Sequence, residues 1–134
     1  MSAGAQRPTS GGPKTILVLE DEGSVQRFIE QTLVDEGFHV ELAKDGLEGL
    51  VRIDRIKPDL IIADIMMPRL DGLTFARAVK AHEQTKAIPI IFLTGRGDSR
   101  SMIEGINVGA RYYLTKPFDP DDLVAKVKKA LGLG

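Results

Sequence analysis

Short apolar runs alternate with longer amphipathic segments along most of the chain. Five of these runs predict strands, because contiguous apolar residues are typical of strands buried on both faces of a parallel sheet. The run at 38–43 alternates more with polar residues, so we expect that strand nearer an edge of the sheet. The predicted strands are Thr15–Glu20, Phe38–Ala43, Leu60–Asp64, Pro89–Thr94 and Arg111–Thr115.

The segments between the strands predict helices, because apolar residues recur there at helical spacing. The first helix covers about Glu22–Glu36 and the third about Leu73–His82. The second opens at Asp45, a fourth is expected between 98 and 109, and Asp119 is placed to cap the last. Three apolar residues of the second helix are expected to face inward: Leu47, Leu50 and Val51.

This alternation predicts an α/β fold, in which a parallel sheet is covered by helices on both faces. Right-handed crossovers leave few topologies for five successive βα units. Among them we predict the flavodoxin-like order 2-1-3-4-5. We therefore expect one (βα)5 domain at 14–134, preceded by a flexible leader at 1–13 that is rich in Gly, Ser and Pro.

The composition fits a single domain that folds in water. Of the 134 residues, 43% are hydrophobic and 28% are charged, and the net charge is -1. The sequence has no basic patch of the kind that binds nucleic acid, no apolar stretch of membrane-spanning length and no signal peptide. Cys is absent, which excludes disulfides and thiolate metal sites. We therefore expect a cytoplasmic protein without nucleic-acid or membrane partners.

Three carboxylates lie at the ends of two predicted strands. Glu20 and Asp21 follow the first apolar run, and Asp64 ends the third strand. Ligands of open α/β sheets bind beyond the carboxyl ends of the strands, so these acids should converge there. The alternative is that each acid is merely solvated. Clustered carboxylates repel one another, which a hard divalent cation relieves, and an all-oxygen ligand set favours Mg²⁺ or Mn²⁺ over Zn²⁺.

Two more polar residues lie at the ends of neighbouring strands. Thr94 ends the fourth strand, and Lys116 follows the fifth. Both can donate hydrogen bonds to a phosphoryl group on Asp64, and an acyl phosphate needs such electrostatic help. The alternative for Lys116 is an ordinary exposed strand-end Lys. A cis bond to Pro117 would help to aim the ammonium group, but the sequence leaves the isomer open.

Four motifs occupy these strand ends. They are Leu-Glu-Asp-Glu at 19–22, Asp-Ile-Met-Met-Pro-Arg-Leu-Asp-Gly at 64–72, Phe-Leu-Thr-Gly at 92–95 and Tyr-Leu-Thr-Lys-Pro-Phe at 113–118. In combination they are highly specific, and the chain resembles the receiver domains of two-component response regulators over about 14–132. The resemblance is to single-domain receivers of the chemotaxis-regulator type.

The resemblance implies a phosphoacceptor and a metal site. Asp64 matches the residue that takes a phosphoryl group from a phosphohistidine on a histidine kinase or a phosphotransfer protein. Glu20 and Asp21 match the acid pair that organises Mg²⁺ together with Asp64. The backbone carbonyl of Met66 matches a further protein ligand.

The resemblance also implies a conformational switch. Thr94 and Lys116 match residues that act on the phosphoryl group, and Tyr113 matches the aromatic residue that turns inward with the Thr. The switch would reshape a face built from the fourth helix, the fifth strand and the last helix, where an unknown output protein or a second copy would bind. Such a receiver assists only its own phosphorylation and dephosphorylation, and we expect no output domain in the chain.

Two other functions stay open at this point. The first is a receiver-like docking module that works without phosphorylation, against which the complete set of acids, Thr and Lys argues. The second is a Mg²⁺-dependent phosphohydrolase. Asp64-Ile65-Met66 argues against it, because the second Asp of the Asp-x-Asp phosphohydrolases is missing.

Overall fold

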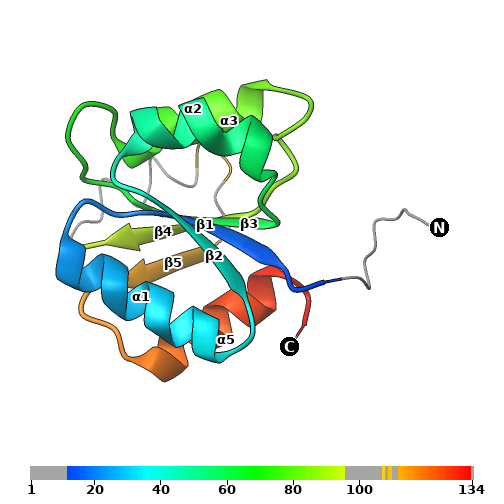
Figure 1. Ribbon diagram of the computed structural model, residues 1–134. Coiled ribbons are helices and arrows are strands. Elements are labelled where there is room, and N and C mark those ends of the chain that lie inside the picture. The colour runs from blue at the N-terminus through cyan, green and yellow to red at the C-terminus, as the bar shows by residue number, and fades with distance from the viewer. Residues whose placement is uncertain (1–11, 96–106, 108, 110–111, 134) are drawn as a thin grey trace.

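A computed structural model describes residues 12–95, 107, 109 and 112–133, and in it the strands form one parallel sheet (Figure 1). The strand order is β2-β1-β3-β4-β5, so the predicted order and the edge position of β2 are confirmed. The strands are β1 (Thr15–Leu19), β2 (His39–Ala43), β3 (Leu60–Asp64), β4 (Ile90–Thr94) and β5 (Tyr112–Thr115).

Helices cover both faces of the sheet, with α2 and α3 on one side and α1 and α5 on the other (Figure 1). Their bounds are α1 (Gly23–Asp35), α2 (Gly46–Ile56), α3 (Gly72–Ala81) and α5 (Pro120–Ala130). The start predicted for α2 at Asp45 and the N-terminal cap predicted at Asp119 are confirmed, since each side chain accepts a hydrogen bond from a backbone N–H of the first turn. The helix predicted at 98–109 lies outside the described residues apart from 107 and 109.

The core has two layers because side chains alternate along each strand. On β1, Ile16 and Val18 pack toward α1 and α5, whereas Leu17 and Leu19 pack toward α2 and α3. All four are fully buried, as the contiguous apolar run predicts for a central strand of a doubly covered sheet. Among the described residues, no helix is both long and apolar enough to cross a membrane.

The orientation of α2 differs from the prediction. Leu47 and Val51 are 44% and 76% exposed, and the buried residues of the helix are instead Gly46, Gly49 and Ile53. The reason is close approach: a Cβ on Gly49 would lie 2.9 Å from the Leu19 side chain. A glycine face lets the helix backbone rest directly on the core. The expectation that Leu47 and Val51 face inward is therefore wrong, because it rested on apolar side chains alone, whereas α2 packs through its glycines.

Candidate functional site

The three predicted acids meet at the carboxyl edge of the sheet. Val18 and Ile62 face the same core layer, and Glu20 and Asp64 lie two residues beyond them on adjacent strands. Side-chain alternation therefore carries both acids to the same side of the edge. Asp21 follows at once, and one carboxylate oxygen from each acid lies within 4.8 Å of the other two. The predicted convergence is confirmed, with Glu20 and Asp64 buried and Asp21 exposed.

Lys116 reaches into this cluster from the end of β5. Its backbone N–H donates to the Thr94 carbonyl at 2.8 Å, which fixes the chain beside β4. Its Nζ lies 2.6 Å from Asp64 Oδ2 and 3.1 Å from Glu20 Oε1, and the bond to Pro117 is cis. Burial alone would lower the pKa of Lys116, but the hydrogen bond and charge of Asp64 and the charge of Glu20 raise it overall. The cluster therefore holds a charged ammonium group at neutral pH.

Glu20 is the most strongly perturbed acid of the cluster. Its Oε2 accepts a hydrogen bond from the Glu22 N–H at 3.0 Å, whereas the buried Oε1 forms an ion pair with Lys116 Nζ at 3.1 Å and has no further partner in the described part of the chain. Burial raises the pKa of Glu20 from 4.5 to about 7. The Glu22 hydrogen bond and Lys116 oppose this rise, and the charge of Asp64 adds to it. A buried carboxylate oxygen whose one described partner is an ammonium group, beside two other acids, fits a hard divalent cation.

The loop after β3 is packed against Asp64. The Met66 N–H donates to Asp64 Oδ1 at 3.0 Å, and the Gly72 N–H donates to the Ile65 carbonyl at 3.0 Å. A Cβ on Gly72 would collide with the Asp64 carbonyl, so only glycine fits there. Asp64 therefore has one carboxylate oxygen bound by Lys116 and the other by the loop.

Thr94 and Tyr113 lie next to this site on β4 and β5. Thr94 is buried at the end of β4, the strand that pairs with β3. Tyr113 is half-buried, and its ring packs against Phe92 with the ring centroids 6.0 Å apart. Burial raises the pKa of Tyr113. The structure thus places both predicted switch residues on adjacent strands, and their movement stays a prediction.

Sequence reasoning missed one residue that supports the site. The Gln26 side chain, on the first turn of α1, donates from Nε2 to the Glu20 carbonyl at 3.0 Å. This hydrogen bond ties the start of α1 to the end of β1. No sequence pattern indicates this hydrogen bond, because a Gln at this point of an amphipathic helix is equally compatible with a solvent-exposed face.

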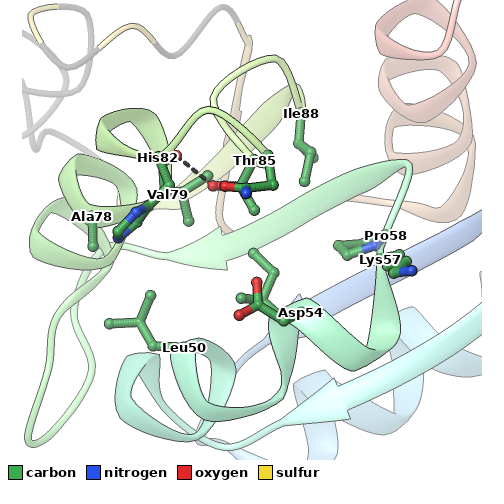
Figure 2. Close-up of a pocket in the computed structure, with 11 residues that line it drawn as sticks. Leu50, Asp54, Lys57, Pro58, Ala78, Val79, His82, Thr85 and Ile88 are labelled. Atoms are coloured by element: carbon green, nitrogen blue, oxygen red, sulfur yellow. Dashed lines mark hydrogen bonds between the residues drawn. The ribbon is translucent and has the colours of Figure 1, made fainter.

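A pocket of about 630 Å³ lies away from the acids, between α2 and α3 (Figure 2). Pro58 and Ile88 line it, and these residues precede β3 and β4, so the pocket is at the amino edge of the sheet. The acids occupy the carboxyl edge. A second pocket, of about 460 Å³, includes Lys116 and the rings of Phe28 and Phe118, and it borders the acid cluster.

Comparison with known families identifies the protein class. The family model of the response regulator receiver domain matches residues 16–128. The chain belongs to this family. The receiver is 42% identical over 119 residues to the phosphate regulon transcriptional regulatory protein PhoB of Pseudomonas aeruginosa, a match that covers 88% of this chain and 52% of PhoB. The chain spans about half the length of the curated relatives it matches.

Solved structures agree with the family and the fold. A putative response regulator from Chloroflexus aurantiacus superposes with a TM-score of 0.86 at 39% identity, covering 90% of this chain and 98% of that one. The receiver domain of the sensor histidine kinase PA1611 from P. aeruginosa gives a TM-score of 0.83 at 30% identity, covering 90% and 99%. That structure has a magnesium ion coordinated in its active-site cleft.

These comparisons confirm the predicted fold and family. The expectation that the protein has no nucleic-acid partner finds no support in them, because PhoB is by name a transcriptional regulatory protein. Since this receiver covers about half of PhoB, the whole relative's activity does not transfer to it directly.

The raised pKa of Glu20 predicts that the metal-free receiver loses stability as the pH rises from 4.5 to about 7. Across this range the folded protein keeps a proton on Glu20 that the unfolded chain has released. The free energy of unfolding should therefore fall by up to about 3 kcal/mol. Chemical denaturation in EDTA at about pH 5 and about pH 7.5 measures the change. Glu20→Gln should remove most of the difference, and an equal pH dependence in that variant would contradict the assignment.

Proposed function

We propose that this receiver is a phosphorylation-controlled binding module with Asp64 as its phosphoacceptor. The observation that carries the proposal is the fixed position of the Asp64 carboxylate. Lys116 Nζ lies 2.6 Å from one oxygen, the Met66 N–H donates to the other at 3.0 Å, and Glu20 and Asp21 lie alongside. A carboxylate held in place by preorganised charges suits phosphoryl transfer, which depends mainly on positioning and charge neutralisation.

In the proposed reaction, Asp64 attacks the phosphorus atom of a phosphohistidine on a histidine kinase or a phosphotransfer protein. A P–O bond to Asp64 forms while the P–N bond to the histidine breaks, and the histidine nitrogen takes a proton from water. Lys116 offsets the charge that arrives with the phosphoryl group, and Thr94 would donate its hydroxyl hydrogen to a phosphoryl oxygen. Lys116 has this charge in place beforehand, because its ammonium group already contacts Asp64.

The donor set at this edge fits Mg²⁺, with Mn²⁺ as a substitute. Glu20, Asp21, Asp64 and the Met66 carbonyl would hold the ion. When bound, Mg²⁺ supplies positive charge that offsets the acids and the phosphoryl oxygens. Two observations support this assignment: the three carboxylates converge, and the buried Glu20 Oε1 has no partner among the described residues besides the Lys116 ammonium group. The magnesium ion in the related PA1611 receiver is a further support.

The output step we propose is a movement of Thr94 and Tyr113 toward the phosphorylated Asp64. This movement would change the face that contains β5, α5 and the predicted helix at 98–109. That face would bind an output protein or a second copy of the chain. On this proposal the receiver assists its own phosphorylation and dephosphorylation and turns over no outside substrate.

Incubation with acetyl phosphate and Mg²⁺, followed by mass spectrometry, tests this function. We expect a phosphoryl adduct on Asp64 that does not form in EDTA. A folded protein that binds Mg²⁺ but stays unmodified would favour the docking module that works without phosphorylation. Steady hydrolysis of a small phosphate ester, abolished by Asp64→Asn, would favour the phosphohydrolase.

A further inference from the structure

The segment 65–72, which we call the β3–α3 loop, lies beside Asp64 and is held by hydrogen bonds between its own backbone groups. The Gly72 N–H donates to the Ile65 carbonyl at 3.0 Å, and the Leu70 N–H donates to the Pro68 carbonyl at 2.7 Å. The same loop supplies the Met66 N–H that binds Asp64 Oδ1. A displacement of the loop would therefore move the hydrogen-bond donor that orients the acceptor.

An ion pair ties the tip of this loop to the start of α2. Arg69 donates to Asp45 Oδ2 from Nε at 2.8 Å and from Nη2 at 2.5 Å. The other oxygen of Asp45 accepts the Glu48 N–H at 2.9 Å and so caps α2. The Asp45 side chain is only 3% exposed, although Arg69 itself is half-exposed. A buried carboxylate with both oxygens bound gives the loop a fixed point on a regular helix.

The backbone conformation at the loop tip is unfavourable by itself, so contacts with neighbouring residues must hold it. Arg69 has a φ of 65°, in the left-handed region that residues other than glycine adopt rarely and at a cost. A second contact lies next to it, where the Gly46 N–H donates to the Leu70 carbonyl at 3.2 Å. A Cβ on Gly46 would lie 2.6 Å from that carbonyl oxygen. The start of α2 therefore holds the loop tip in an unfavourable backbone conformation through two adjacent contacts.

We propose that the Arg69–Asp45 ion pair is a latch that positions Asp64 and Met66 for phosphoryl transfer. Arg69 and Asp45 are positioning residues that act through the β3–α3 loop. Without their ion pair, Arg69 loses the contact that offsets its left-handed conformation, and the loop gains freedom at Met66. This role rests on the proposed function, but the effect on the loop can be measured in metal-free, unphosphorylated protein.

Amide hydrogen exchange in the presence of EDTA tests the latch directly. Arg69→Asn removes the charge but tolerates the left-handed conformation, and Asp45→Asn keeps an oxygen to cap α2 but loses its charge. In both variants we expect the Met66 amide to exchange about tenfold faster, while the amides of β1 keep their wild-type rates. Arg77→Gln makes the same charge change at an exposed position of α3 and should leave Met66 unchanged.

The rate of phosphorylation by acetyl phosphate at saturating Mg²⁺ provides the second readout. It should fall about tenfold in Arg69→Asn and in Asp45→Asn, with little further loss in the double variant, because the two residues act as one unit. Wild-type exchange at Met66 in both variants would overturn the latch, and so would faster exchange with an unchanged phosphorylation rate. If the wild-type protein is never phosphorylated, the proposed function fails, whereas the exchange result still decides whether the ion pair holds the loop.

Discussion

Asp64→Asn is expected to abolish phosphorylation and leave a folded protein. Asn has nearly the same shape as Asp, and its amide oxygen can still accept the Met66 N–H that binds Asp64 Oδ1 at 3.0 Å. A neutral amide is not a nucleophile toward phosphorus, so the rate of modification should fall by about a thousandfold or more. Mass spectrometry after incubation with acetyl phosphate and Mg²⁺ measures the loss, and far-ultraviolet circular dichroism checks the fold.

Asp21→Asn is the matched control for this experiment. Asp21 belongs to the same acid cluster but is exposed, and we assign it to the metal rather than to the phosphoryl group. Its loss should weaken Mg²⁺ binding, so a higher Mg²⁺ concentration should restore phosphorylation. The same concentration should not restore it in Asp64→Asn. If Mg²⁺ rescued both variants, or neither, the separation of acceptor from metal ligand would be contradicted.

The convergence of Glu20 and Asp64 could be predicted because it depends on local patterns and one general rule. Each acid follows a contiguous apolar run, and such runs are buried strands when they alternate with amphipathic helices. Parallel strands in one sheet bring their carboxyl ends to one edge. The strand register then places the two acids side by side, since Leu19 pairs with Ala63 and the residue that follows each of them is an acid.

The parts that could not be predicted depend on contacts between distant segments. The sequence indicates Asp45 as the start of a helix, but its pairing with Arg69, 24 residues away, depends on how the β3–α3 loop turns. The exposure of Val51 depends on Gly49, which brings α2 close to Leu19. A pattern of apolar side chains gives no weight to a residue that packs through its backbone.

Lys116→Met is expected to destabilise the metal-free receiver by about 2–3 kcal/mol. Lys116 Nζ lies 2.6 Å from Asp64 and 3.1 Å from Glu20, and both acids are almost fully buried. Methionine has a similar length and apolar stem, so the substitution mainly removes the positive charge beside the buried Asp64 and the partly protonated Glu20. Chemical denaturation in EDTA at neutral pH measures the loss, and Lys116→Arg, which keeps a positive charge, should lose less.

Addition of Mg²⁺ separates the two roles that we assign to Lys116. If the ammonium group offsets the acids, its removal should make the variant gain more stability from Mg²⁺ than the wild-type protein gains, because the ion then supplies the missing charge. Phosphorylation should nevertheless stay slow, because the donor to the phosphoryl group is still missing. A variant as stable as the wild-type protein in EDTA would show that the ion pairs contribute little. Restoration of rapid phosphorylation by Mg²⁺ alone would show that Lys116 serves only to balance the charge of Glu20 and Asp64.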